Sequence, residues 1–477
     1  MPDMNQNSPI ILWFRDDLRL SDHPALSAAA KLGVPIIPLF ILDDLSSDAR
    51  RRGGAARWWL QASLESLGRE VQALGGRVIL RRGRAPSVLE DFAKATKAQG
   101  VFFTRLYEPS RVEEEQDVAA MCRMQGITCR RYPGALLFEP EDIATQKGEP
   151  FRVFTPFSKA CLSRGGIKAP LSVPDNIIWP DSWPETDPLS SWGLYRGSPD
   201  WAKDFPTYWT PGSAGASQKA ERFVVGPVSD YSDKRDIPSL DFTSSLSPHL
   251  SFGEISPRQV WHRVHHQEGA EGRGVGSQAF LRQILWREFC RHLLFHWPQM
   301  TAKPFDPKFD AFPWREDDGD LLAWQKGQTG YPLVDAGMRQ LWHSGWMHNR
   351  VRMVVASFLT KHLMISWRAG AEWFWDTLVD ADLANNTAGW QWVAGCGCDA
   401  APYFRVFNPI LQSRKFDPEG FYIRRWVPEL APLSNRQVHA PWEDGVLPPD
   451  YPAPIVDHAA ARARALDAYN GIRQRSN

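Results

Sequence analysis

Residues 345–353, with the sequence GWMHNRVRM, carry side chains suited to a planar aromatic ligand. On a helix, Asn349, Arg352 and Met353 fall at i, i+3 and i+4, so an amide, a guanidinium and a thioether share one face. Such a face combines hydrogen-bond donors with a soft apolar surface. The alternative is that Met353 fills the core while Arg352 forms a surface ion pair.

A second polar group lies in residues 380–392, DADLANNTAGWQW. Asp380, Asp382 and Asn386 fall within about two turns of a predicted helix, and Asp382 and Asn386 share one face. The preceding residues are mostly apolar, so buried carboxylates here would need cationic partners, and Arg352 is the obvious candidate. Helix caps or a salt-bridge network are the structural alternative.

A loop rich in hydroxyl groups precedes Pro248. Thr243, Ser244, Ser245 and Ser247 place four hydroxyls within five residues. Hydroxyls and backbone N–H groups can hold a diphosphate without net positive charge. An ordinary capped turn is the alternative interpretation.

The segment 278–297 predicts a helix on which Gln283, Trp286 and Arg287 share a face. An indole beside an amide and a cation can stack on a displaced nucleic-acid base and hydrogen-bond to it. The alternative for Trp286 is core packing.

Two kinds of element must position these side chains. In the first 130 residues, strand-like apolar runs alternate with helical stretches, the runs at 10–14, 36–42, 78–80 and 101–104 and the helices near 54–74, 86–99 and 111–125. This alternation predicts right-handed βαβ units and a doubly wound parallel sheet. No GxGxxG follows the first strand, so the dinucleotide fingerprint is missing.

The rest of the chain predicts a connector and a helical domain. Residues 170–215 are rich in Pro, Trp, Ser and Gly, which is typical of a long surface segment. After residue 216 the apolar spacing becomes helical, most clearly at 277–297, 332–343, 345–365 and 370–384. We therefore expect an α/β domain over 1–135, a connector over 136–215 and an all-α domain over 216–477.

The composition limits the protein class. The 55 basic and 55 acidic residues cancel, so any nucleic-acid contact must come from a local patch. The six cysteines are scattered without metal-ligand spacing, which predicts free thiols and no metal site. The N-terminus is polar and no apolar run is long enough to span a bilayer, so we expect a soluble, cytoplasmic protein.

The order and spelling of these segments match one family. The chain resembles the photolyase/cryptochrome family over nearly its whole length, through LWFRDDLRLSDHPAL at 12–26, TSSLSP, WREF, TGYPLVDAGMRQL at 329–341, GWMHNRVRM and AAPYFRVFNP at 400–409. The resemblance implies a Rossmann-like antenna domain and a helical domain that holds FAD in a U-shaped conformation. It also implies repair of cyclobutane pyrimidine dimers in UV-damaged DNA: the light-excited, reduced anionic flavin gives an electron to a flipped-out dimer, the ring splits and the electron returns.

The resemblance also implies roles for single residues. The diphosphate and ribityl part of FAD would contact Tyr231, Thr243, Ser244, Ser245, Leu246 and Ser247. The rest of the FAD site would comprise Gln283, Arg287, Arg352, Asp380, Asp382 and Asn386. In this site Arg352 pairs with Asp380 and Asn386 faces the flavin N5, where plant-type cryptochromes tend to have Asp. The implied catalytic residues are Asn386, Trp286, Met353 and Gln283.

DNA contacts follow from the same resemblance. Those facing the dimer are Trp286, Trp392, Met353 and Asn349. Those elsewhere on the DNA are Arg235, Arg350 and Gln412. Many dimer photolyases have a glutamate at the position of Gln283. A glutamine keeps the hydrogen-bonding shape of glutamate but lacks its charge and its acidic proton. This departure suggests the bacterial class III branch.

Further expectations concern electrons and light capture. Trp390, Trp367 and Trp314 match the family's tryptophan chain from flavin to surface, which photoreduces oxidised flavin. The antenna chromophore is expected to be 5,10-methenyltetrahydrofolate, with 8-hydroxy-deazaflavin as the alternative, and Glu108 and Glu149 are candidate ligands. We expect a monomer without an obligate protein partner.

Two other functions compete with repair. One is a cryptochrome-type photoreceptor, which binds flavin and senses light without repairing DNA. The other is a light-independent flavin oxidoreductase. Asn386 and Met353 favour repair over the first, and the residues expected to face the dimer disfavour the second.

Overall fold

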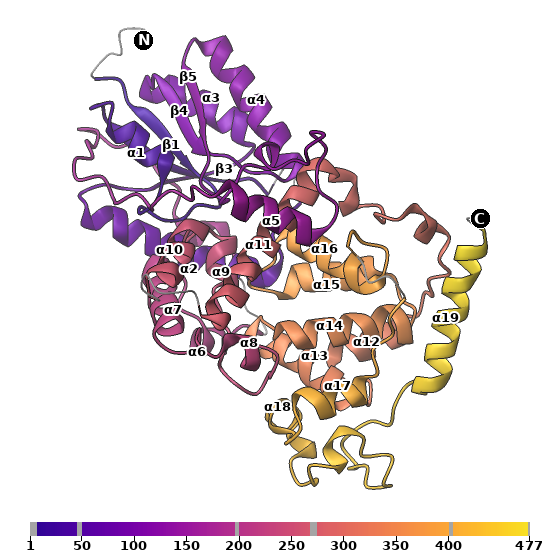
Figure 1. The fold of residues 1–477 in the computed structure, drawn as a ribbon. Helices are drawn as coiled ribbons and strands as arrows, with labels where there is room; N and C mark the ends of the chain where they lie inside the picture. The colour runs from indigo at the N-terminus through magenta and orange to yellow at the C-terminus, as the bar shows by residue number, and fades with distance from the viewer. Residues whose placement is uncertain (1–6, 45–49, 196–199, 268–273, 400–403, 476–477) are drawn as a thin grey trace.

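The computed structural model describes residues 7–44, 50–195, 200–267, 274–399 and 404–475 (Figure 1). A parallel sheet contains β1 (Ile10–Phe14), β2 (Ile36–Leu42), β3 (Ile79–Arg82), β4 (Gly100–Thr104) and β5 (Thr128–Tyr132). Its order is β3-β2-β1-β4-β5, and all the pairings are parallel. This confirms the doubly wound sheet.

Four helices cover the two faces of the sheet. They are α1 (Pro24–Ala30), α2 (Gly54–Ala73), α3 (Ala85–Thr96) and α4 (Pro109–Gln125). Alternate residues of β1 point to opposite faces. Leu12 packs in the core that includes residues of α1 and α2, whereas Trp13 packs with residues of α3 and α4.

Strand β5 was not predicted from the sequence. Its sequence, TCRRY, lacks an apolar run because it forms the edge of the sheet and is only partly buried. The order of the strands reverses between β1 and β4. In open parallel sheets, ligands bind at the carboxyl ends of the strands near such a reversal.

The chain after residue 216 is helical, as expected, and the segment 136–215, expected to be a connector, also contains the helices Phe154–Arg164 and Phe205–Tyr208. The first helices after the sheet are α5 (Phe154–Arg164), α6 (Phe205–Tyr208), α7 (Ser213–Val225), α8 (Tyr231–Lys234), α9 (Ser247–Ser251), α10 (Pro257–Gln267) and α11 (Val275–His296). The later ones are α12 (Asp318–Lys326), α13 (Pro332–Ser344), α14 (Asn349–Ser357), α15 (Trp367–Thr377), α16 (Leu383–Ala394), α17 (Pro409–Phe416), α18 (Phe421–Trp426) and α19 (His458–Arg475).

Two predicted helices are interrupted. The helix expected over 345–365 begins only at Asn349, and it becomes a π-helical turn at Phe358–His362. The helix expected over 370–384 ends at Thr377, and α16 begins at Leu383 because the Asp382 side chain caps it by accepting the Asn385 N–H. Asp380 therefore lies in the connection between two helices. Within the described ranges, no helix is long and apolar enough to cross a membrane.

The π-helical turn buries a lysine. Lys361 is 1% exposed, donates a hydrogen bond to the Arg405 carbonyl at 3.1 Å, and lies 3.6 Å from the centre of the Phe404 ring. Burial lowers the pKa of Lys361 to about 7. Between pH 10.5 and 7 the unfolded chain therefore takes up a proton that the folded chain does not, so the free energy of unfolding decreases as the pH falls.

Lys361→Met is expected to flatten this pH dependence and to stabilise the fold near pH 7 by up to about 4 kcal/mol. The measurement is denaturant unfolding at several pH values from 7 to 10. Lys147→Met, which changes an exposed lysine, is the control and should unfold like the wild type. Equal pH slopes for Lys361→Met and the wild type would contradict the prediction.

Candidate functional site

A cavity of about 390 Å³ lies among helices α11, α14, α15 and α16. Its volume is within the range of sites for cofactors and drug-sized ligands. The predicted site residues that line it are Arg235, Gln283, Trp286, Asn349, Arg352, Met353, Asp380, Asp382, Asn386, Trp390 and Trp392. The cavity therefore brings together the expected dimer-facing residues and most of the expected flavin-ring contacts.

Asp380 and Arg352 form an ion pair in the wall of the cavity. Arg352 Nη2 lies 2.8 Å from Asp380 Oδ2, which is the pair expected from the sequence. Asp380 is only 8% exposed, and within the described part of the chain its Oδ1 has no hydrogen-bond partner. A buried carboxylate oxygen without a donor is costly, so this atom fits a ligand that brings an N–H or O–H group. FAD offers such donors.

Asp382 is held by a second arginine. It accepts the Asn385 N–H at 2.8 Å and forms an ion pair with Arg291. Burial alone would raise the pKa of Asp382, but Arg291 and the hydrogen bonds from Asn385 keep it below its ordinary value. Arg291 was missed from the sequence. Its signal was the spacing of four residues from Arg287 on the same helix.

Asn386 has a defined amide orientation. Its Nδ2 donates to the Ala371 carbonyl at 2.9 Å, which leaves the amide oxygen as an acceptor for a ligand. Gln283 also lines the cavity, and its Nε2 donates to the Ala279 carbonyl of its own helix at 3.3 Å. Both side chains can therefore present an oxygen to a bound group.

Two tryptophans line the cavity from different helices. Trp286 on α11 is half-buried, and one face of its ring stacks on Phe154 with a centroid distance of 3.7 Å and an interplanar angle of 6°. Trp392 on α16 is also half-buried, and its Nε1–H donates to the Asp399 carbonyl at 3.0 Å. Each of the two indole rings therefore contacts the protein and also lines the cavity.

The hydroxyl-rich loop lies close to α9, and the described residues around the cavity do not include residues 243–247. Ser244 Oγ accepts the Leu246 N–H at 3.3 Å, and Ser247 Oγ accepts the Trp346 Nε1–H at 3.3 Å. Tyr231 is buried at the start of α8, beneath Arg235, which does line the cavity. The role expected for this loop and Tyr231 stays a prediction.

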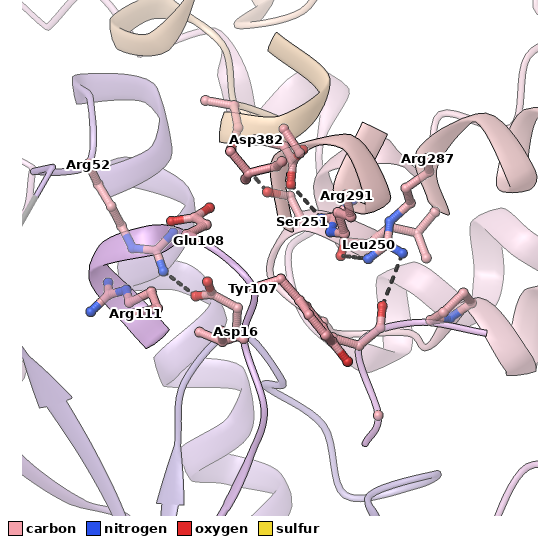
Figure 2. Close-up of a pocket in the computed structure, with 18 of the residues that line it drawn as sticks. Asp16, Arg52, Tyr107, Glu108, Arg111, Leu250, Ser251, Arg287, Arg291 and Asp382 are labelled. Atoms are coloured by element: carbon pink, nitrogen blue, oxygen red, sulfur yellow. Dashed lines mark hydrogen bonds and ion pairs between the residues drawn. The ribbon is translucent and has the colours of Figure 1, made fainter. Parts of the chain in front are cut away.

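Arg287 does not share the cavity with Gln283 and Trp286, contrary to the expectation of one common face. It lines a second pocket, where it donates to the Ala135 carbonyl at 3.0 Å and the Leu250 carbonyl at 3.4 Å (Figure 2). Its long side chain reaches these carbonyls around the side of α11. Burial lowers the pKa of Arg287 to about 10.

This second pocket lies between the sheet domain and the helical domain. Glu108 lies there with Arg52, Arg111 and Asp16, and Arg52 pairs with Asp16 (Figure 2). Burial, with the nearby Asp16 carboxylate, raises the pKa of Glu108. The described residues around this pocket do not include Glu149, which is exposed on a loop. The two candidate antenna ligands therefore do not meet in this pocket.

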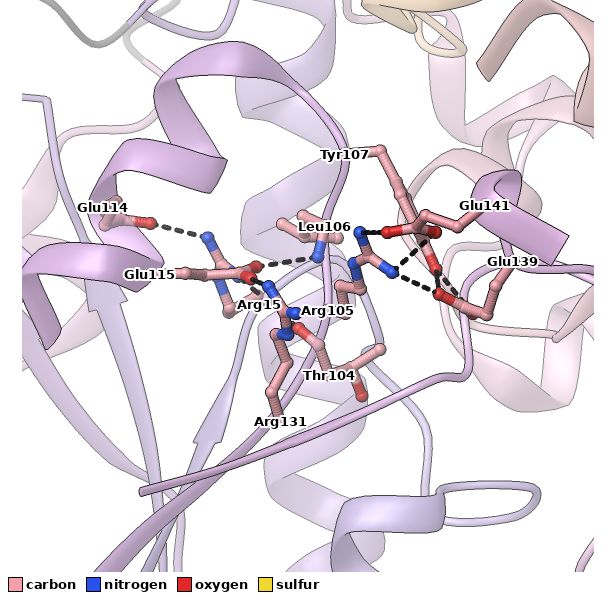
Figure 3. A network of polar contacts seen from close by, with 10 residues as sticks. All are labelled: Arg15, Thr104, Arg105, Leu106, Tyr107, Glu114, Glu115, Arg131, Glu139 and Glu141. Carbon is pink, nitrogen blue, oxygen red and sulfur yellow. Dashed lines mark hydrogen bonds and ion pairs between the residues drawn. The ribbon is translucent and has the colours of Figure 1, made fainter. Parts of the chain in front are cut away.

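A third, smaller pocket lies at the carboxyl ends of β1 and β2, lined by Phe14, Leu42, Asp44 and several arginines. One of these, Arg15, is part of an ionic network in the sheet domain (Figure 3). Arg15 pairs with Glu114 at 2.7 Å and with Glu115. The network holds a guanidinium at the edge of this pocket.

Of the three tryptophans of the expected electron chain, Trp390 alone is among the described residues that line the cavity. Trp390 lines the cavity and is 3% exposed, and its Nε1 has no hydrogen-bond partner among the described residues. Trp367 is 2% exposed at the start of α15. Trp314 is half-buried beside Phe312 at a ring distance of 4.4 Å. Exposure is therefore greatest at Trp314.

Of the three residues predicted to contact the DNA outside the dimer, two lie near a carboxylate. Arg350 Nη2 is 2.6 Å from Asp236 Oδ2, and its guanidinium lies 4.3 Å from the Phe416 ring centre. Arg235 is 3.7 Å from the same carboxylate group. Gln412 lies on α17 next to Leu411, which is 58% exposed.

Comparisons with known proteins agree with this arrangement. Residues 10–175 match the family model described as DNA photolyase, and residues 280–471 match the FAD binding domain of DNA photolyase. The chain is 47% identical to the deoxyribodipyrimidine photo-lyase of Agrobacterium fabrum over 98% of this chain and 99% of that one. It is 38% identical to cryptochrome-1 of Arabidopsis thaliana over 97% of this chain and 70% of that one. A bacterial class III photolyase from Agrobacterium tumefaciens superposes with a TM-score of 0.94 and 46% identity over 99% of both chains.

Proposed function

The chain belongs to the photolyase/cryptochrome family, and from this premise we propose that it repairs cyclobutane pyrimidine dimers in DNA under blue light, as a deoxyribodipyrimidine photo-lyase. The observation that carries the proposal is the single cavity between α11, α14 and α16. It combines Asp380 Oδ1, which has no hydrogen-bond partner among the described residues, with an aromatic and thioether wall formed by Trp286, Trp392 and Met353. The side of the cavity with Asp380 suits a flavin, and the wall with Trp286, Trp392 and Met353 suits a flipped-out dimer.

Within this cavity the polar residues differ in their proposed roles. Asp380 and Asp382, each held by an arginine, accept hydrogen bonds from FAD, and Asn386 turns its amide oxygen toward the flavin ring. The bound, reduced FAD supplies, after absorbing light, the electron that opens the cyclobutane ring. Arg287 lines the second pocket, where it donates to the Ala135 and Leu250 carbonyls, and its contact with the cofactor stays a prediction.

The wall formed by Trp286, Trp392 and Met353, which we call the lesion-binding wall, offsets the cost of base flipping. Extruding a nucleotide costs about a few kcal/mol and least for a damaged pair, and stacking on an aromatic ring returns about 1–3 kcal/mol per base. Trp286 and Trp392 supply these rings, and Met353 and Asn349 supply further contacts. Arg235, Arg350 and Gln412 contact the DNA backbone, so affinity should decrease with salt.

A photoreceptor without repair activity is the second candidate, favoured by the similarity to cryptochrome-1 of Arabidopsis thaliana. The test is to mix the reduced protein with an oligonucleotide that carries one thymine dimer, with and without blue light, and to measure restored thymines. Repair in light only supports a photolyase. No repair in either condition would leave the photoreceptor as the better account.

The tryptophan chain provides a separate prediction. Trp390→Phe is expected to slow light-driven reduction of oxidised bound flavin by at least about tenfold, because phenylalanine is much harder to oxidise than tryptophan and Trp390 is the member of the three that lines the cavity. The measurement is the loss of oxidised-flavin absorbance under blue light with an external thiol. Dimer repair by chemically reduced protein is the control and should be unchanged. Equal photoreduction rates would exclude Trp390 as the first donor.

We also propose an antenna chromophore, methenyltetrahydrofolate or else a deazaflavin, bound near the carboxyl ends of β1 and β2. The reversal of strand order beside these ends supports the location. Glu108 lies in the neighbouring interdomain pocket and Glu149 is exposed, so neither is proposed as a main ligand. We further propose that the protein acts as a monomer. Mass spectrometry of the released chromophores separates the two antennas.

A further inference from the structure

Phe154 packs against one face of the Trp286 ring. Its ring is 1% exposed and stacks in parallel on the indole, with the centroids 3.7 Å apart. The Arg282 guanidinium lies 4.9 Å from the centre of the same phenylalanine ring. Phe154 comes from α5, far from α11 in the sequence, so the position of Trp286 depends on where α5 begins.

The start of α5 is held by Asp399. Phe154 is the first residue of the helix, and its N–H donates to Asp399 Oδ2 at 3.3 Å. The first N–H groups of a helix have no partner within the helix, and a carboxylate there also interacts favourably with the helix dipole. Asp399 therefore acts as a cap that is supplied by a distant segment.

The same aspartate holds Trp392. The Trp392 Nε1–H donates to the Asp399 backbone carbonyl at 3.0 Å. Asp399 adopts the left-handed conformation with φ of 55°, which Asp and Asn tolerate better than most residues with a β-carbon. The backbone of Asp399 thus contacts one tryptophan of the wall, while its side chain contacts the support of the other.

We propose that Asp399 and Phe154 form a brace that sets the distance between Trp286 and Trp392, and so positions the two rings for a flipped-out dimer. The proposal rests on the proposed function, because it takes these two tryptophans as the lesion-binding wall. The brace contains one stack and two hydrogen bonds, in the order Trp286, Phe154, Asp399, Trp392. Both residues act through the tryptophans and are positioning residues.

A fixed spacing favours a rigid ligand. The two pyrimidines of a dimer are joined covalently, so they fit a gap of one width, and rings that are already in place lose little entropy on binding. If the brace is cut, each ring must be ordered when the lesion arrives. Binding to undamaged DNA uses the backbone contacts and should not change.

The experiment compares three substitutions at Asp399. Asp399→Ala removes the carboxylate and disfavours the left-handed backbone, and Asp399→Gly removes only the carboxylate. Asp399→Asn loses the charge but keeps a side-chain oxygen that can accept the Phe154 N–H, and it tolerates the left-handed backbone. The measurements are affinity for an oligonucleotide with one thymine dimer, affinity for the undamaged oligonucleotide, and FAD content. Alanine and glycine are expected to weaken dimer binding about tenfold with unchanged binding of undamaged DNA and unchanged FAD content. Asparagine should restore wild-type selectivity.

Phe154→Leu tests the other half of the brace. It keeps the N–H bond to Asp399 and removes the stack, so it should cause a similar selective loss. The double variant with Asp399→Ala should lose little more than either single variant, because both cut one connected unit. Additive losses would overturn the brace.

Wild-type selectivity in Asp399→Ala or Asp399→Gly, or equal losses for damaged and undamaged DNA, would also overturn the brace. Trp286→Ala, measured alongside, separates this failure from that of the proposed function. If Trp286→Ala weakens dimer binding while the Asp399 variants bind the dimer like the wild type, only the brace proposal is refuted. Normal dimer binding in Trp286→Ala removes both the lesion-binding wall and the brace.

Discussion

Trp286→Ala is expected to weaken binding of thymine-dimer DNA by about 10- to 100-fold, because a base stacked on an aromatic ring is stabilised by about 1–3 kcal/mol. The substitution also leaves one face of Phe154 uncovered. FAD content should remain near that of the wild type, since the residues proposed to hold the flavin are mainly the aspartate and arginine side chains of the same cavity. The measurements are titration with labelled damaged and undamaged oligonucleotides and the flavin absorbance of the purified protein.

The matched control for Trp286→Ala is Trp342→Ala. Trp342 is 43% exposed on α13, so its removal should not change dimer binding. Loss of flavin from Trp286→Ala would mean that Trp286 contacts the cofactor rather than the lesion. Unchanged dimer affinity would exclude it from the lesion-binding wall.

Asp380→Asn is expected to reduce FAD content at least about tenfold. Removing one partner of a buried ion pair costs about 3–5 kcal/mol, because the remaining charge is left unpaired. Here the remaining group is Arg352. The substitution also removes the negative charge of a carboxylate whose Oδ1 has no hydrogen-bond partner among the described residues and is proposed to accept from the cofactor. The measurement is flavin released per polypeptide after denaturation, with FAD affinity from titration of the apoprotein.

The control for Asp380→Asn is Asp236→Asn. Asp236 pairs with Arg350, lies 3.7 Å from Arg235 and is 30% exposed in its side chain, so this variant also frees arginine side chains, but neither of them pairs with Asp380 or Asp382. It should retain FAD and alter only DNA binding, by freeing Arg350 to contact phosphate. Full flavin content in Asp380→Asn would show that Asp380 does not hold the cofactor.

Some parts of the fold could be predicted because their signal is local. β1, β2 and β4 are buried on both faces and read as continuous apolar runs, whereas the polar edge strand β5 does not. Helical spacing placed Asn349, Arg352 and Met353 together, and all three line the cavity. Helical spacing wrongly predicted that Asp380 lies within a helix. The apolar periodicity continues across the break between α15 and α16, and the sequence pattern therefore does not show that a new helix begins after the Asp382 cap.

The sequence alone therefore determined the sheet class, the helical second domain, the family and the residues that share one turn of a helix. These depend on backbone periodicity and on motifs within a few residues of one another. Only the tertiary structure decided that Arg291 pairs with Asp382, that Arg287 faces a separate pocket, and that Asp399 joins Phe154 to Trp392. Such contacts depend on how distant segments pack against each other, and no local pattern encodes that placement.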